Sequence, residues 1–147
     1  IEDSSRYMLY LDVMTPYMNK EVYSEESREK DAYLEYLTTL LSLSGEDEEN
    51  AKRNAQKFFE FELELAFHML DIEKTGSITK SKNVISYNKV GSMFPDFDME
   101  KVLEGCALKK SDEILVADTA LTQRLAQLYN QSNLDVLKTD TKILCPR

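Results

Sequence analysis

The sequence predicts a mainly helical fold, and three observations lead to this prediction. The chain of 147 residues holds only 4 glycines and 3 prolines, whereas an all-β chain with many tight turns needs more of both. Apolar residues recur at three- and four-residue spacing through two long stretches, as they do on one face of an α-helix. Capping residues stand at the ends of these stretches. We therefore expect helices with at most one or two short strands.

The first long helix is predicted at about residues 24–43. Ser24 and Ser27 are N-cap candidates, and the two glutamates between them suit the first turn of a helix, where the helix dipole favours negative charge. A single apolar face follows from the helical spacing of Tyr33, Tyr36, Leu37, Leu40 and Leu41.

A second long helix is predicted at about residues 46–71, forming an antiparallel hairpin with the first. Gly45 can adopt the left-handed conformation that ends a helix, and Ser44 and Asp47 suit a capping box for the next one. The aromatic residues on its apolar face are more simply explained as part of the hydrophobic core than as a ligand-binding cage. Full burial of one phenylalanine side chain stabilises the fold by roughly 1.5–3 kcal/mol. The apolar positions are Ala51, Ala55, Phe58, Phe59, Leu65, Ala66, Met69 and Leu70.

The rest of the chain is expected to hold shorter elements. Residues 7–12 and 113–117 read as short strands, and residues 73–86 as a polar loop. Shorter helices are predicted after Asp98, Asp118 and Ser132, each of which is an N-cap residue type. Because 147 residues are the usual length of one domain, we expect residues 1–147 to form a single domain.

Composition and charge exclude several classes of protein. The 18 basic and 27 acidic side chains give a net charge of −9, which repels a phosphate backbone, so nucleic acid is not expected as a partner. No stretch approaches the roughly 20 consecutive apolar residues of a membrane helix. The chain begins at Ile1 without a signal-like region. A soluble protein, and a fragment of a longer one, is the expectation.

The residues that commonly carry chemistry are few. His68 is the one histidine, which excludes an HExxH zinc motif and any other site that needs two imidazoles. Cys106 and Cys145 are compatible with one disulfide or with two reduced thiols. Neither cysteine stands in a glycine-flanked or helix-opening context that would activate it. We therefore assign no catalytic, cofactor-binding or metal-binding residue to the chain.

Two sets of residues are candidate metal sites, and simpler explanations are preferred for both. Glu64 and His68 lie four residues apart on one helix face, but two ligands do not make a selective zinc site. Residues 71–82 resemble a twelve-residue EF-hand calcium loop, with acidic first and third positions and Gly76 at the sixth. Lys82, however, occupies the twelfth position, where calcium needs a bidentate glutamate. The simpler reading is a helix end followed by a turn.

The order of several short motifs resembles the N-terminal region of the neprilysin-like M13 zinc metallopeptidases. Each motif alone is weak, and their order and spacing along nearly the whole chain carry the resemblance. The tail agrees with it through residues 114–116 and 133–138. The motifs are Tyr7-Met8-Leu9-Tyr10-Leu11-Asp12, Tyr23, Glu62-Leu63-Glu64-Leu65-Ala66, Tyr87-Asn88 and Phe94-Pro95-Asp96-Phe97-Asp98.

The resemblance implies a non-catalytic part of a larger enzyme. In that family two histidines of HExxH and a later glutamate hold zinc, and all three lie downstream of the matching region. The resemblance thus implies a hydrolase parent that contains zinc, lies outside the cell or at its surface, and cleaves peptides. This chain would pair with the catalytic domain, help to enclose the cavity and restrict substrate size. On its own it should be inactive and hold no cofactor.

Two alternatives of other classes remain open at the level of sequence. A degenerate EF-hand-like module around residues 71–82 would bind calcium or a protein partner. A plain helical scaffold with an acidic surface would bind a basic partner, and its binding would weaken in salt.

Overall fold

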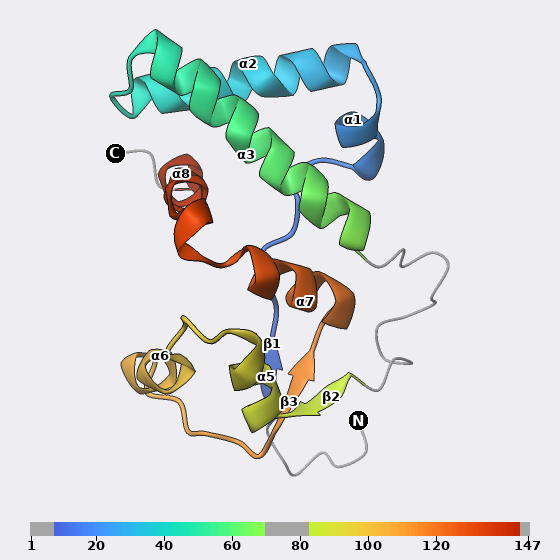
Figure 1. The fold of residues 1–147 in the computed structure, drawn as a ribbon, viewed down its shortest axis with the longest axis vertical. Coiled ribbons are helices and arrows are strands. Elements are labelled where there is room, and N and C mark those ends of the chain that lie inside the picture. The colour runs from blue at the N-terminus through green and yellow to red at the C-terminus, as the bar shows by residue number, and fades with distance from the viewer. Residues whose placement is uncertain (1–7, 70–82, 145–147) are drawn as a thin grey trace. The chain divides into compact units, whose positions relative to one another are not determined.

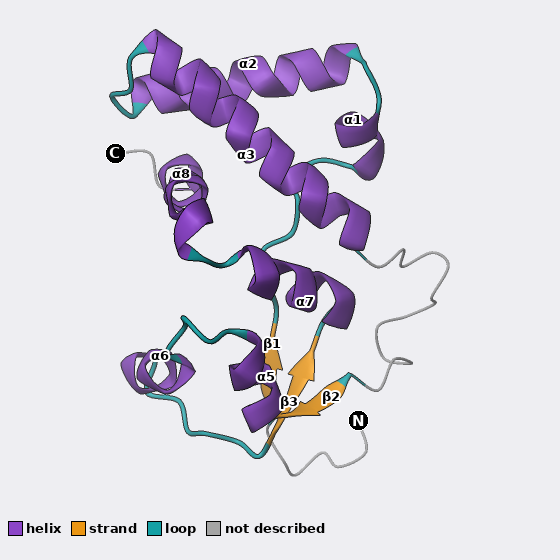
Figure 2. Ribbon diagram, viewed as in Figure 1, coloured by secondary structure: helices purple, strands orange, loops and turns teal. Residues whose placement is uncertain are grey.

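The computed structural model describes residues 8–69 and 83–144 (Figure 1). The chain divides into two compact units, and each unit is built from two separate stretches of sequence. Unit 1 combines residues up to Met14 with Met69–Tyr129, and unit 2 combines Thr15–His68 with the residues from Asn130 onward. Helices dominate the described residues and strands are few (Figure 2), so the predicted fold class is confirmed. The single-domain organisation of residues 1–147 stays a prediction.

Unit 2 contains the predicted helical hairpin. Helix α2 (Arg28–Leu43) and helix α3 (Glu48–His68) pack against each other, as Figure 1 shows for the cyan and green helices. Gly45 between them has a φ of 99°, the left-handed conformation that glycine adopts at little cost. A short helix α1 (Lys20–Ser24) precedes the hairpin and contacts both of its helices.

Helix α2 starts later than predicted but ends where predicted, at residue 43, while α3 is shorter than predicted at both ends. Helix α2 starts at residue 28 because Ser27 is its N-cap and accepts a hydrogen bond from the Lys30 amide at 3.2 Å. Residues 20–24 belong to α1. Helix α3 starts at residue 48 because Asp47 caps it, accepting from the Asn50 amide at 2.9 Å. The hydroxyl of Ser44 instead donates to the Leu41 carbonyl at 2.7 Å.

The predicted core faces of the hairpin are largely confirmed. Buried side chains follow one face of each helix, with Leu37 and Phe58 fully buried. Two predictions were wrong, because Tyr36 on α2 is 55% exposed and Met69, just beyond α3, is 42% exposed. Helix α3 ends at residue 68, so Met69 no longer follows its helical face. Leu70 lies outside the described residues. The buried apolar positions are Tyr33, Leu37, Leu41, Ala51, Ala55, Phe58, Phe59, Phe61, Leu65 and Ala66.

A fourth helix, α8 (Leu134–Leu144), completes unit 2 and contacts both α2 and α3. It begins two residues after the predicted cap. Asn130, rather than Ser132, caps the preceding turn of 3₁₀ helix (Gln131–Asn133), and its side chain accepts from the Ser132 amide at 2.9 Å. Lys142 on α8 forms an ion pair of 2.5 Å with Glu46, which precedes α3.

Unit 1 is built on a three-stranded sheet in the order β1-β3-β2. Strand β3 (Glu113–Val116) pairs in parallel with β1 (Leu9–Leu11), with Leu9 opposite Ile114. It pairs antiparallel with β2 (Val84–Ser86). The strands predicted around residues 7–12 and 113–117 are confirmed. The prediction of a polar loop over residues 73–86 was wrong for residues 84–86, which form β2, because so short a run does not stand out from the polar residues before it; residues 73–82 lie outside the described residues.

Among its described residues, unit 1 also contains three helices. Helix α6 (Met99–Gly105) and helix α7 (Thr119–Leu128) follow the predicted caps Asp98 and Asp118, which accept from backbone amides at 3.0 and 2.9 Å. Helix α5 (Tyr87–Met93) was not predicted. Its residues Tyr87 and Val90 form the buried core of the sheet with Ile114 and Val116 of β3.

Candidate functional site

The most unusual polar residue of unit 2 is Glu62, in the middle of the buried face of α3. Its side chain is 0% exposed, although it lies between Phe59 and Leu65 on a stripe of apolar residues. Charged side chains are almost never fully buried without partners. Glu62 is therefore expected to have hydrogen-bond partners inside unit 2.

Two hydrogen bonds hold the two oxygens of Glu62. The backbone amide of Tyr17 donates to Oε1 at 2.9 Å, and the hydroxyl of Tyr33 on α2 donates to Oε2 at 2.6 Å. Tyr23 on α1 also faces the carboxyl group, and its hydroxyl oxygen accepts from the Met18 amide at 2.9 Å. Three separate parts of unit 2 thus converge on one buried side chain.

A second carboxyl group joins this arrangement from α8. The hydroxyl of Tyr17 donates to Oδ1 of Asp140 at 3.1 Å, and Asp140 is half-buried. Tyr17 therefore binds Glu62 through its backbone and Asp140 through its side chain. We call Glu62, Tyr17, Tyr23, Tyr33 and Asp140 the Glu62 cluster.

Burial dominates the electrostatics of the cluster. It raises the pKa of Glu62 above its ordinary value, although the hydrogen bonds from Tyr33, the Tyr17 amide and Tyr23 oppose the shift. Burial likewise raises the pKa of Asp140, against the hydrogen bond from Tyr17. The pKa of Tyr17 is raised to about 12 by burial and by the nearby charge of Asp140. Burial, together with Glu62, also raises the pKa of Tyr23 and of Tyr33.

Aromatic rings surround the cluster on the core side. The rings of Tyr23 and Phe59 have centroids 5.2 Å apart, and those of Tyr33 and Phe59 are 6.3 Å apart. The ring of Tyr17 lies 6.3 Å from that of Phe58. Such rings place the polar atoms of the cluster in an apolar setting.

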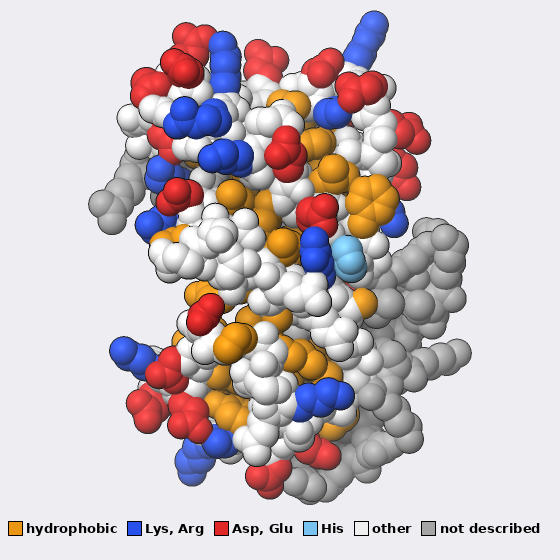
Figure 3. Space-filling model, in the orientation of Figure 1, with side chains coloured by type: hydrophobic (Ala, Val, Ile, Leu, Met, Phe, Trp, Pro, Cys, Tyr) orange, Lys and Arg blue, Asp and Glu red, His pale blue; other side chains and the backbone are white. Residues whose placement is uncertain are grey.

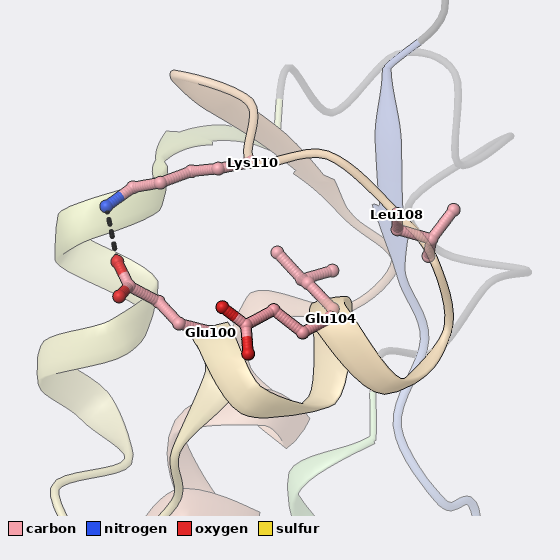
Figure 4. Close-up of a pocket in the computed structure, with 5 residues that line it drawn as sticks. Glu100, Glu104, Leu108 and Lys110 are labelled. Carbon is pink, nitrogen blue, oxygen red and sulfur yellow. Dashed lines mark hydrogen bonds and ion pairs between the residues drawn. The ribbon is translucent and has the colours of Figure 1, made fainter.

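A pocket of about 270 Å³ lies in unit 1 (Figure 4). It is lined by Glu100, Leu103 and Glu104 of α6 and by Leu108 and Lys110 of the loop that follows. The Nζ atom of Lys110 lies 2.7 Å from Glu100, which raises the pKa of Lys110. Both side chains are more than half exposed, and an exposed ion pair adds little free energy. The pocket shows no arrangement that could perform catalysis.

Lys110 also connects the pocket to the core of unit 1. Its Nζ lies 4.5 Å from the centroid of the Tyr87 ring, a distance typical of a cation–π contact. The amide of Tyr87 donates to the Asp112 carbonyl at 2.9 Å. The Tyr87 hydroxyl is buried and has no hydrogen-bond partner among the described residues.

The motifs that carry the family resemblance have structural roles where the structure describes them. Tyr87 belongs to the core of the sheet, and Glu62 to the cluster in unit 2. Phe94 and Phe97 pack with Tyr129, at centroid distances of 6.4 and 5.6 Å. These residues of the motifs therefore contribute to the packing and hydrogen bonding of the fold.

The other candidates from the sequence are not brought together. His68 is exposed, and its Nδ1 lies 2.8 Å from the backbone carbonyl oxygen of its own helix neighbour Glu64. Cys106 is exposed at the end of α6, while Cys145 lies outside the described residues. The whole EF-hand-like segment, residues 71–82, also lies outside the described residues. The disulfide and the calcium loop therefore stay predictions.

The charged side chains on one face of the described residues are of both signs. Acidic and basic side chains are interspersed on the face shown in Figure 3, in keeping with the net charge of −9. None of the helices in residues 8–69 and 83–144 combines the length and apolar character needed to cross a membrane.

Comparison with solved structures identifies the fold as one found in a zinc protease. The chain is similar to the zinc metalloprotease Zmp1 of Mycobacterium tuberculosis, determined by cryo-electron microscopy in an open state, with a TM-score of 0.76 and 19% sequence identity. The match covers 96% of this chain and 23% of the Zmp1 chain. At this identity the likeness establishes the fold alone. No curated protein matches the chain.

The family follows from the sequence itself. Residues 1–142 match the model of the N-terminal region of peptidase family M13. The chain therefore belongs to peptidase family M13 and is an N-terminal region of that family, which confirms the resemblance noted from the motifs.

The residues that the structure describes do not fit a zinc ion. The sequence has a single histidine, and within the described ranges no three side chains of His, Cys, Asp or Glu gather closely enough to hold a metal. A catalytic zinc site needs three protein ligands arranged around an open position. The zinc that the family implies has no place among these residues.

Proposed function

We propose that the chain is the non-catalytic helical N-terminal part of an M13 zinc endopeptidase, where it helps to enclose the peptide-binding cavity and limits substrate size. The observation that carries this proposal is the match of residues 1–142 to the N-terminal M13 region, in a chain that spans only 23% of the length of Zmp1. The single histidine agrees with a role outside the zinc centre.

The contribution to catalysis would be physical rather than chemical. A rigid wall around a zinc centre excludes folded proteins and admits peptides. By removing bulk water it also strengthens the electrostatic interactions that act on the substrate. The stable hairpin of α2 and α3 and the packed sheet of unit 1 suit such a wall. The catalytic domain of the parent and its peptide substrates are the partners, and the parent lies outside the cell or at its surface.

The experiment measures zinc and cleavage with and without a catalytic domain. After dialysis, the purified chain should retain well under one zinc ion per molecule. It should not cleave a fluorogenic peptide. Co-expression with the catalytic part of an M13 peptidase that lacks its own N-terminal region should yield a complex that cleaves short peptides but spares folded proteins.

A control variant tests whether the folded wall is required. Leu37→Asp places a charge in the fully buried face of α2 and should abolish the complex, while Leu43→Asp, at a position 73% exposed, should leave it intact. Stoichiometric zinc in the isolated chain, or peptide cleavage by it, would contradict the proposal. So would a complex whose cleavage does not depend on substrate size.

A further inference from the structure

The side chains of the Glu62 cluster carry carboxyl and hydroxyl groups, and none of them is positively charged. No Lys, Arg or His in the described parts of the chain forms an ion pair with Glu62 or with Asp140. A buried carboxylate is usually stabilised by an opposite charge. Here the partners of Glu62 are one backbone amide and tyrosine hydroxyls, and the charged group that faces it is a second carboxylate.

The two oxygens of Glu62 have different freedom to carry a proton. Oε1 meets the backbone amide of Tyr17, which can only donate, so Oε1 must accept in every state. Oε2 meets the hydroxyl of Tyr33, which can donate or accept after rotating about its C–O bond. A proton can therefore reside on Oε2 and be donated to the Tyr33 oxygen without loss of either contact.

The cluster also links Glu62 to the last helix of the chain. Tyr17 binds Glu62 through its amide and Asp140 of α8 through its hydroxyl, at 2.9 and 3.1 Å. When both carboxyl groups are ionised, two negative charges act on the same tyrosine, and because Glu62 is fully buried their repulsion is less screened than between two exposed groups.

We propose that the Glu62 cluster is a proton-operated latch for α8: with Glu62 protonated, Tyr17 and α8 are held on α3, and loss of this proton as the pH rises loosens α8. The titratable groups that face Glu62 come from every element packed on that part of α3. They are Tyr17 of the segment before α1, Tyr23 of α1, Tyr33 of α2 and Asp140 of α8.

The direction of the pH effect follows from the raised pKa of Glu62. A carboxyl group whose folded-state pKa lies above its unfolded value binds protons more tightly in the folded state. Its contribution to stability is complete below the unfolded pKa of about 4.5 and is lost as the pH rises through the higher folded value. The raised pKa of Asp140 acts in the same direction.

Hydrogen exchange of the α8 amides in the 147-residue chain tests the latch. After correction for the intrinsic exchange rate, protection of α8 should fall by roughly threefold to tenfold from about pH 5 to about pH 7.5. Glu62→Gln keeps the size of the side chain but stays neutral, so its α8 protection should fall less than that of the wild type over this range, with only the contribution of Asp140 left. The matched control is Glu60→Gln, which removes an exposed charge from the same helix and should behave like the wild type.

A second measurement keeps the proposal falsifiable if Glu62→Gln fails to fold. Infrared spectra of the wild type with labelled glutamate should contain the carbonyl band of a protonated, buried glutamic acid at pH values above the ordinary pKa of 4.5, where an exposed glutamate is ionised. Equal pH dependence of α8 protection in the wild type and Glu62→Gln would overturn the latch, and so would the absence of that band. Neither readout uses peptidase activity, so the outcome is independent of the proposed function.

Discussion

Tyr17 and Asp140 stand 123 positions apart in the sequence, yet the hydroxyl of Tyr17 donates to Oδ1 of Asp140 at 3.1 Å. The contact joins the two stretches of sequence that form unit 2. Most of the residues of unit 1 lie between these two stretches in the sequence. Contacts of such high sequence separation require the closure of a long loop. Unit 2 therefore depends on α8, and residues after Asn130 should be needed for it to reach full stability.

Removal of the Tyr33 hydroxyl should destabilise unit 2. Tyr33→Phe leaves Oε2 of the buried Glu62 without its 2.6 Å donor, and an unsatisfied buried acceptor costs about 1–3 kcal/mol. Urea unfolding at neutral pH measures the loss. Tyr36→Phe on the same helix removes a hydroxyl from a side chain that is 55% exposed and should change stability by less than about 0.5 kcal/mol. Equal effects of the two variants would show that the hydroxyl of Tyr33 does not matter.

Truncation of a leucine side chain on α2 should destabilise the protein much more at a buried position than at an exposed one. Leu37→Ala removes a fully buried side chain and should cost about 2–5 kcal/mol through lost burial and the cavity left behind. Leu43→Ala makes the same change on the same helix where the side chain is 73% exposed, so its effect should be below about 0.5 kcal/mol. Thermal and urea unfolding of the pair measure the difference. A small loss for Leu37→Ala would mean that α2 does not pack on α3 in solution.

The long elements were predictable because their patterns are long. Two helices of 16 and 21 residues repeat the apolar spacing often enough to identify one face, and Gly45 marks the turn between them. Strand β2 and helix α5 span only 3 and 7 residues. Neither is long enough to show a period, so their existence depends on pairing with β3 and on the core around Tyr87 and Val90. Such tertiary contacts are not visible in local sequence.

The Glu62 cluster could have been found only in part. Glu62 falls three residues after Phe59 and three before Leu65, so helical spacing places it on the buried face, and a glutamate on an apolar stripe is a signal of a buried hydrogen-bonded group. Glu62 otherwise stands out in the sequence only as part of the motif Glu62-Leu63-Glu64-Leu65-Ala66. Its partners Tyr17 and Asp140 could not be predicted, because they come from elements far apart in the chain.

Glycine substitutions should have opposite effects at two positions. Gly45 has a φ of 99°, which costs an alanine roughly 1–2 kcal/mol, so Gly45→Ala should destabilise the hairpin. Gly91 lies in α5 without a positive φ, and no atom lies within 4 Å of the position that a Cβ would occupy. Gly91→Ala should therefore stabilise the protein by about 0.4–1 kcal/mol. Unfolding midpoints of the two variants check the signs, and the same sign for both would contradict the backbone geometry described at these two positions.

Neutralisation of Asp140 should shift the titration of Tyr17. Asp140→Asn keeps an oxygen that can accept from the Tyr17 hydroxyl, but it removes the charge that helps to raise the pKa of Tyr17 to about 12. The phenolate of Tyr17 should then form at a lower pH, closer to the ordinary value of 10.0, because a negative neighbour no longer opposes ionisation. NMR of ring-labelled tyrosine follows Tyr17 separately, with Tyr17→Phe used for assignment. Asp135→Asn, an exposed change on the same helix, should leave the titration unchanged, and an equal shift from both variants would mean that net charge, not the contact, sets the pKa of Tyr17.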